Sequence, residues 1–159
     1  IIEGIAEHIG EMMEEDPNLM IIWGSGGTLR RMAKHLGIDK TVLGIDIIMG
    51  GDILSEDVNE RELLDNLSSH DGKSIILLSP MGGQGFLIGR GNLQISPEVI
   101  LQVGIDGILG IATPAKLLTI NALRIDSGDN QLDDDFRAKK YLKVLQGYRT
   151  TRLLKIAIE

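Results

Sequence analysis

The sequence lacks cysteine altogether, has few aromatic residues and contains no long apolar run. Without cysteine there is no disulfide, no thiolate ligand for zinc and no cysteine nucleophile. The single tryptophan, two tyrosines and two phenylalanines are scattered, so they form no platform on which nucleic acid bases would stack. No apolar run approaches the roughly 20 residues that cross a bilayer, and no signal peptide pattern occurs. We therefore expect a cytoplasmic protein that does not enter the membrane.

Basic residues are also scarce. The chain has 16 lysines and arginines against 23 aspartates and glutamates, which gives a formal net charge of −7. Nucleic acid binding relies on clustered lysine and arginine, so this balance argues against nucleic acid as a partner. The 3 histidines, His8, His35 and His70, lie far apart without the spacing of a metal site, and we interpret them as surface residues. A small-molecule ligand is the expected partner.

The length of 159 residues suits one domain with a hydrophobic core and is too short for two. The chain begins at Ile1, already inside an amphipathic helical pattern that continues to about residue 15. We therefore predict a single α/β domain over residues 1–159. We expect this domain to be a fragment, or the C-terminal domain, of a longer polypeptide.

Helical patterns alternate with short continuous runs of isoleucine, leucine and valine, which are typical of strands buried on both faces of a parallel sheet. Two hairpins are expected, one turning at Gly50-Gly51 and one at residues 146–151. The predicted fold is α/β, with a mostly parallel, Rossmann-like, three-layer sheet, helices on both faces and antiparallel hairpins at the margin. The expected strands cover residues 19–23, 41–49, 52–54, 75–78, 107–112, 123–125, 141–145 and 152–158.

A glycine-rich turn, Gly24-Ser25-Gly26-Gly27-Thr28, follows the first buried strand directly and leads into a helix. The N-terminus of a helix presents unpaired N–H groups and a partial positive charge, so the turn is a candidate phosphate site. The alternative is a tight structural turn in which Thr28 or Ser25 caps the helix. The motif is neither a P-loop nor a GxGxxG fingerprint, because Leu29 stands where the third glycine would be.

A second glycine-rich stretch, MGGQGFLIGRGN, covers residues 81–92. Its five glycines give the backbone access to conformations that side chains forbid. A loop that loses so much entropy on ordering usually lets a ligand or another backbone approach closely. Its one charged residue is Arg90, whose guanidinium suits carboxylate or phosphate. We favour a ligand loop over a tight structural or interface loop. The candidate contacts are Gly82, Gly83, Gln84, Gly85, Arg90 and Asn92.

Three aspartates are candidates for binding a ribose or a metal ion. Asp46 lies 22 residues after Gly24, about where a dinucleotide fold places its ribose-binding acid. Asp126 and Asp129 are candidates for Mg²⁺ or a hydroxylated ligand, or Asp129 caps the helix that follows it. Because ligands bind at the carboxyl ends of parallel strands, three loops are expected to converge at one edge of the sheet. These loops are residues 24–28, 81–92 and 126–129.

The glycine stretches belong to a longer series of short blocks. These are WGSGGT (23–28), LGID (43–46), DVNE (57–60), GGQGFLIGRGN (82–92), QISPEVI (94–100), ATPAKL (112–117), DSGD (126–129) and GY (147–148). Together they resemble the C-terminal half of the prokaryotic, notably archaeal, ATP-NAD-kinase-like proteins. The similarity covers nearly the whole chain, and the block that begins at Gly82 and continues through SPEV is specific.

This resemblance implies a role in phosphorylating NAD to NADP, with ATP or polyphosphate as donor and Mg²⁺ assisting. It also implies a partner, the missing N-terminal half, which carries the family's Gly-Gly-Asp-Gly-Thr turn and its ribose-facing aspartate. This chain lacks that motif, and its nearest equivalent has Gly26 where the acid would fall. We therefore assign no catalytic residue to this chain. We expect it to supply nucleotide and phosphate binding to a kinase.

Two other functions remain open. A weaker resemblance connects the first glycine turn to ribose-5-phosphate isomerase and glucosamine-phosphate isomerase sheets, which bind a sugar phosphate at such a turn. An isomerase needs a general base nearby. Alternatively, the chain is a non-catalytic regulatory or oligomerisation domain, whose glycine loop packs against the missing half or a second copy. The candidate bases for an isomerase are Asp46, Asp52, Glu56 and Asp57.

Overall fold

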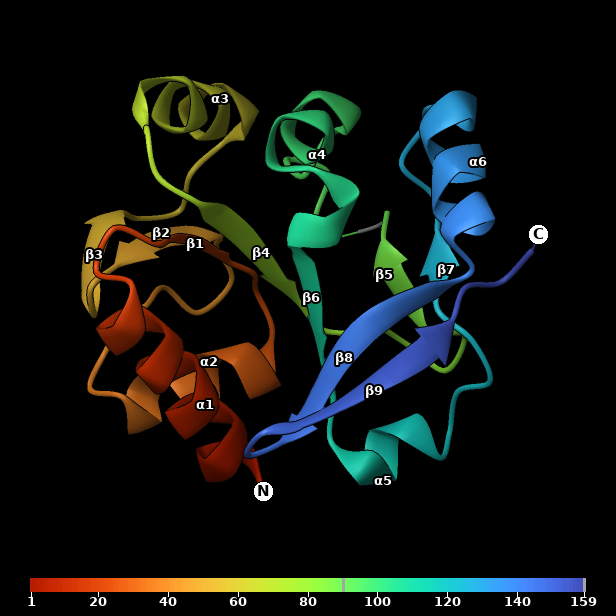
Figure 1. Cartoon of the computed structure of the whole chain (residues 1–159), viewed down its shortest axis with the longest axis horizontal. Helices are drawn as coiled ribbons and strands as arrows, with labels where there is room; N and C mark the ends of the chain where they lie inside the picture. The colour runs from red at the N-terminus through yellow and green to blue at the C-terminus, as the bar shows by residue number, and fades with distance from the viewer. Residues whose placement is uncertain (90, 159) are drawn as a thin grey trace.

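A seven-stranded sheet forms the centre of the computed structural model, which describes residues 1–89 and 91–158 (Figure 1). In spatial order its strands are β3 (Asp52–Ser55), β2 (Asp46–Met49), β1 (Met20–Trp23), β4 (Ser74–Leu78), β6 (Ile108–Ile111), β8 (Tyr141–Gly147) and β9 (Thr150–Lys155). The four central strands β1, β4, β6 and β8 run parallel to one another. The carboxyl ends of these strands therefore share one edge of the sheet.

Helices pack on both faces of this sheet. They are α1 (Ile2–Glu15), α2 (Gly27–His35), α3 (Glu60–Ser69), α4 (Pro97–Val103), α5 (Pro114–Leu117) and α6 (Asn130–Lys139), with a 3-10 turn at Ile105–Gly107. Side chains of β1 alternate between two hydrophobic clusters: Met20 and Ile22 join the cluster of α3, α4 and α6, and Ile21 and Trp23 join that of α1 and α2. The predicted three-layer α/β fold is confirmed. No helix in the described part of the chain combines the length and the apolarity needed to cross a membrane.

Antiparallel hairpins close both margins of the sheet, as predicted: β2 pairs with β3, and β8 pairs with β9. The strand β2 is shorter than predicted, because residues 41–45 form a loop with Val42 and Leu43 exposed. The N–H of Thr41 donates to the Asp46 carboxylate at 2.7 Å instead of joining a strand ladder. The side chain of Asp46 thus ends the ladder at this point.

The helices α4 and α5 each begin at a residue whose side-chain hydroxyl caps the helix N-terminus. Ser96 Oγ accepts a hydrogen bond from the Val99 N–H ahead of α4, and Thr113 Oγ1 accepts one from the Lys116 N–H ahead of α5, both at 3.3 Å. A proline follows each cap at the first helical position, where its missing N–H is not needed. The cap at Thr113 fixes α5 at the carboxyl end of β6.

A separate two-stranded parallel sheet, β5 (Phe86–Ile88) with β7 (Arg124–Ile125), corrects the expectation that residues 123–125 form a strand of the main sheet. The chain reverses after β4, since Met81 pairs antiparallel with Phe86. As a result β5 and β7 run toward α4 and α6, whereas β6 runs toward α5 (Figure 1). The loop of residues 126–129 opens at the opposite edge from residues 24–28, so the expected convergence is wrong for this third loop.

Candidate functional site

The first glycine turn (residues 24–28) lies at the carboxyl end of β1. The Gly24 N–H donates to the Leu77 carbonyl of β4 at 3.0 Å, and a Cβ on Gly24 would lie 2.5 Å from that same oxygen. This glycine is therefore required by the close approach of β1 and β4. Gly26 and Gly27 have a different environment, because both are exposed and a Cβ on either would meet nothing within 4 Å.

The N-terminus of α2 has no side-chain cap. Gly26 occupies the N-cap position with φ of 115°, and neither Ser25 nor Thr28 accepts a hydrogen bond from the first turn. The alternative in which one of these two residues caps the helix is wrong. Unpaired N–H groups at a helix N-terminus favour an anion. The helix itself is held to the sheet by Trp23, whose Nε1 donates to the Leu29 carbonyl at 2.8 Å.

The second glycine turn (residues 82–85) follows β4 and is closed by two backbone hydrogen bonds between Met81 and Phe86, at 2.8 and 3.2 Å. Gly85 has φ of 76°, and a Cβ there would lie 2.6 Å from the Ala122 carbonyl, so only glycine fits. Gly82 and Gly83 are exposed, and a Cβ on either would meet nothing. One half of the turn therefore packs against the protein, and the other half is open.

A hollow of about 550 Å³ adjoins the open half of this turn. Met81 and Phe86 give it an apolar lining, and Gln84 adds a polar side chain at the exposed rim. Ligand pockets commonly combine an apolar wall with a few polar groups in this way. The remaining lining residues are Gly82, Gly83 and Gly91.

Two cations beside the second glycine turn had no role in the sequence prediction. Lys116 of α5 donates from Nζ to the Gly82 carbonyl at 2.9 Å, and Arg124 of β7 donates from Nε to the Gln84 carbonyl at 3.1 Å. Lys116 belongs to the ATPAKL block, which was the available signal. Arg124 had no signal, because its proximity depends on the pairing of β5 with β7.

In the part of the long glycine stretch that follows β5, Asn92 stabilises the backbone conformation. Asn92 is buried; its Oδ1 accepts the Gly89 N–H at 3.0 Å, and its Nδ2 donates to the Leu87 carbonyl at 3.1 Å. With both polar atoms bound to backbone, Asn92 does not fit the predicted ligand contact. Arg90, the other predicted contact beyond the turn, lies outside the described residues.

Asp46 does not fit a ribose contact, because its side chain is fully buried. Its carboxylate accepts hydrogen bonds from the Thr41 N–H at 2.7 Å, the Thr41 hydroxyl at 2.6 Å and the Asp57 N–H at 2.9 Å. Beside it, the buried Lys40 Nζ donates to the Thr41 and Gly44 carbonyls. Burial lowers the pKa of Lys40, and the charge of Asp46 partly offsets this. Asp46 is thus a structural acid and is unsuited to act as a general base.

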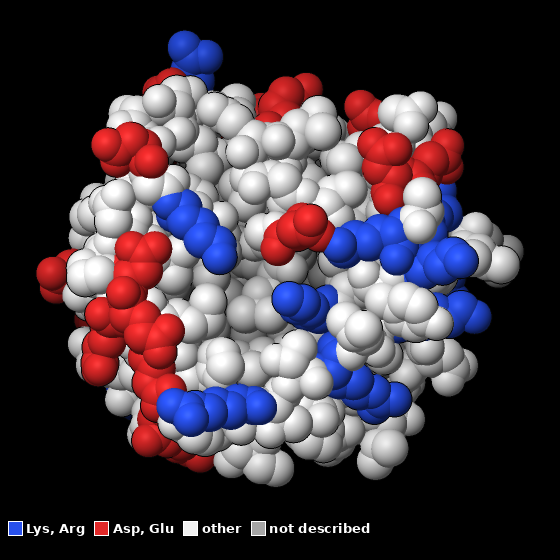
Figure 2. Space-filling view, viewed as in Figure 1, with Lys and Arg blue, Asp and Glu red and all other residues white. Residues whose placement is uncertain are grey.

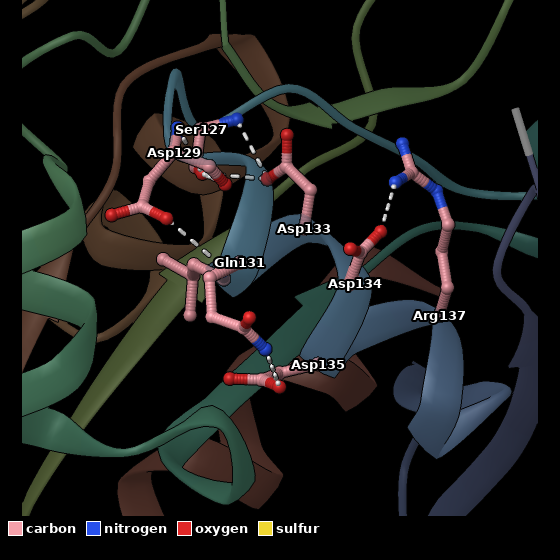
Figure 3. A network of polar contacts seen from close by, with 8 residues as sticks. Ser127, Asp129, Gln131, Asp133, Asp134, Asp135 and Arg137 are labelled. Carbon is pink, nitrogen blue, oxygen red and sulfur yellow. Dashed lines mark hydrogen bonds and ion pairs between the residues drawn. The ribbon is translucent and has the colours of Figure 1, made fainter.

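Among the residues that the structure describes, Asp126 and Asp129 belong to no group of three or more histidine or acidic side chains placed to hold a metal ion. Asp129 caps α6, since its Oδ1 accepts the Leu132 N–H at 3.1 Å; the capping alternative for this residue is confirmed. Asp133 is buried and binds the Ser127 N–H and hydroxyl at 3.1 and 2.5 Å (Figure 3). These bonds commit Asp129 and Asp133 to the structure of the loop and of α6.

The described residues do not fit the Mg²⁺ that the resemblance implies. Within residues 1–89 and 91–158 there is no group of three or more histidine, aspartate or glutamate side chains placed to hold a metal ion. Two of the candidate acids are also committed to hydrogen bonds with the backbone, Asp46 in the core and Asp129 at the helix cap. We derive no metal-dependent step from this chain.

The family of ATP-NAD kinase C-terminal domains matches residues 16–156. Searches of curated proteins and of solved structures find no match. The matched segment contains every strand of both sheets and both glycine turns, and it begins directly after α1. This chain therefore belongs to the ATP-NAD kinase C-terminal domain family.

Proposed function

We propose that this chain supplies nucleotide and phosphate binding to an NAD-kinase-like phosphotransferase, and that the catalytic acid comes from outside it. Family membership supports the reaction class. The absence of an acid at Gly26, together with the burial of Asp46, supports the division of roles. NAD, NADP and ATP are the ligands that the family suggests.

The observation that carries this proposal is the position of the uncapped α2 N-terminus beside the second glycine turn. The two follow β1 and β4, which are neighbouring parallel strands joined by the Gly24–Leu77 hydrogen bond. Phosphate oxygens would accept hydrogen bonds from the N–H groups of Gly27 and Thr28, where the helix dipole also favours negative charge. The ring of the same nucleotide would then find an apolar surface at Met81 and Phe86.

A charge placed at the start of α2 tests this proposal. We expect Gly27→Glu to weaken binding of ATP and NADP at least about tenfold, because the carboxylate repels phosphate at short range. The same substitution should leave the free energy of unfolding unchanged or raise it slightly, since acids at a helix N-terminus are stabilising and the site has open space. Isothermal titration gives the affinities, and urea unfolding followed by Trp23 fluorescence gives the stability.

The matched control is Asn130→Glu, which adds the same charge at the first residue of α6, an exposed position at the other edge of the sheet. It should leave affinity unchanged. If the unmodified chain binds none of NAD, NADP and ATP at millimolar concentration, the proposed function is rejected. If Gly27→Glu binds as tightly as the unmodified chain, the phosphate does not sit on α2.

A further inference from the structure

Lys116 makes a contact that packing alone does not require. Its Nζ reaches from α5 to the Gly82 carbonyl at 2.9 Å, joining residues 34 positions apart in the sequence. Both partners lie near the surface, where a lysine is normally free to extend into water. The bond therefore selects one orientation of the exposed peptide between Gly82 and Gly83.

That orientation decides where the Gly83 N–H points. In a trans peptide the C=O and the following N–H project to opposite sides of the chain, and the chain contains no cis peptide among its described residues. With the Gly82 carbonyl turned toward Lys116, the Gly83 N–H points away from α5. Gly83 lines the hollow, whereas Lys116 does not. The N–H thus faces the hollow side of the turn.

This N–H is available to a ligand. Among the described residues no backbone or side-chain acceptor pairs with it. Gly83 is exposed and has open space around its α-carbon.

A similar contact recurs two peptides further along. Arg124 Nε donates to the Gln84 carbonyl at 3.1 Å, and its backbone N–H donates to the Gly85 carbonyl at 2.9 Å. Three carbonyls of the turn therefore point toward α5 and β7, and their partners are two cationic residues. A backbone N–H on the opposite side of such a turn is placed to donate to an anion.

We propose that Lys116 is a positioning residue that holds the Gly82 peptide so that the Gly83 N–H donates to a phosphoryl oxygen of the ligand. Lys116 acts through the peptide and does not itself contact the phosphate. The assignment of phosphate as the ligand chemistry rests on the proposed function. The contact itself is independent of the phosphate site proposed on α2, so the two can fail separately.

Amide NMR of the ¹⁵N-labelled 159-residue chain, titrated with inorganic pyrophosphate, tests this inference. In the unmodified chain the Gly83 amide should shift in a saturable way, and the Gly27 and Thr28 amides should report the α2 site in the same spectra. Lys116→Met keeps the aliphatic stem but removes the donor, so the dissociation constant read at Gly83 should rise about fivefold to tenfold. Lys116→Arg retains a donor and should restore most of the affinity.

Lys139→Met is the matched control. Lys139 of α6 also bonds a distant partner, Asp106, but it lies away from both glycine turns. Its loss should leave the Gly83 titration unchanged. Sodium chloride at equal ionic strength separates pyrophosphate binding from a general salt effect. The fluorescence of Trp23 verifies that each variant is folded.

The outcomes separate the two proposals. A shift at Gly27 and Thr28 without one at Gly83 overturns the inference and leaves the proposed function standing. A shift at Gly83 without one at Gly27 and Thr28 supports the inference and shows that the phosphate does not sit on α2. If Lys116→Met and the unmodified chain give the same dissociation constant at Gly83, Lys116 has no positioning role. If neither turn responds to pyrophosphate, the inference and the phosphate site on α2 are both wrong, and the titrations with NAD, NADP and ATP decide the proposed function.

Discussion

Two positions of the second glycine turn, Gly83 and Gly85, differ in whether the fold requires a glycine there. Gly85 has φ of 76° and lies where a Cβ would come within 2.6 Å of the Ala122 carbonyl, so its lack of a side chain is a packing requirement. Gly83 has neither constraint. An exposed glycine without a structural reason is consistent with a ligand that approaches the backbone closely. The sequence GGQG shows no difference between these two positions.

Asp46 gives the clearest prediction at the scale of single residues. Asp46→Asn replaces an acceptor by an amide that cannot accept all three hydrogen bonds now made to Thr41 and Asp57. It also removes the negative charge that compensates the buried Lys40. We expect the free energy of unfolding to fall by on the order of 3 kcal/mol, measured by urea denaturation at pH 7. Nucleotide affinity should be unchanged in the remaining folded protein.

Asp52→Asn is the matched control for this substitution. Asp52 begins β3 and is exposed, so the same chemical change should cost less than about 0.5 kcal/mol. If Asp46→Asn loses nucleotide affinity without losing stability, the result would support the hypothesis that Asp46 contacts a ribose. The two measurements therefore separate a structural acid from a ligand-binding acid.

At the scale of elements, the tip of the β8–β9 hairpin is fastened to α1. Glu11 of α1 accepts hydrogen bonds from the Tyr148 hydroxyl at 2.6 Å and from the Arg149 guanidinium at 3.3 Å. The Arg149 N–H also donates to His8 Nδ1 at 3.1 Å. Figure 2 shows acidic side chains grouped over α1 on this face and basic ones over β8 and β9. These hydrogen bonds from the hairpin tip to Glu11 and His8, called the clamp below, join the acidic region over α1 to the basic region over β8 and β9.

Stability should therefore depend on the ionisation of Glu11. The hydrogen bond from Tyr148, with help from Arg149, lowers the pKa of Glu11 below its ordinary value of 4.5. A carboxyl whose pKa is lowered by folding contributes stability that is fully present above pH 4.5 and is lost as the pH falls through the folded-state pKa. We expect Glu11→Gln to lower stability at pH 7 and to reduce the loss of stability between pH 4.5 and pH 3.

Urea unfolding at pH 7, 5, 4 and 3 measures this effect. Glu14→Gln, three residues further along the same helix and without a bond to the hairpin, is the control and should retain the full acid-side slope. Equal slopes for Glu11→Gln and the unmodified chain would show that the clamp does not contribute to the stability of the fold. Because Glu11 is only partly buried, we expect a modest effect that salt weakens.

The sequence predicted well those elements whose hydrophobic pattern can be recognised within a single chain segment. Runs such as Met20–Trp23 and Ser74–Leu78 are apolar throughout because both faces of the central strands are covered. Residues 41–45 were misassigned because the Asp46 side chain captures the Thr41 N–H, an interaction that periodicity does not report. The pairing of β5 with β7 was missed because neither strand has more than three residues.

The candidate site was predictable only where its position follows from the order of strands along the chain. The two glycine turns follow adjacent parallel strands, so connectivity alone placed them together. The chain reversal at Met81 sends the 126–129 loop to the other edge, and this depends on a tertiary pairing that the sequence does not encode locally. The contact from Lys116 to Gly82 depends on the placement of α5 at the same edge. The hydrogen bond that orients the Gly82 peptide is therefore visible only in the folded molecule.

At the scale of the whole molecule, the two hydrophobic clusters lie on opposite faces of one sheet and share its strands. Unfolding of either face should expose the other, so the chain should unfold in a single cooperative transition. Phe136 of α6 is fully buried in one cluster, and Trp23, the only tryptophan, is fully buried in the other. A substitution at Phe136 therefore tests whether the two faces are coupled.

Phe136→Ala should destabilise the chain by about 3–5 kcal/mol through lost burial and the cavity it leaves. If the faces are coupled, the urea midpoint reported by Trp23 fluorescence falls by the same amount as the midpoint reported by far-ultraviolet circular dichroism. Phe136→Leu, which keeps most of the volume, should shift both midpoints by a smaller and again equal amount. A fluorescence midpoint that stays in place while the dichroism midpoint falls would show that α1, α2 and their face of the sheet unfold independently of α6.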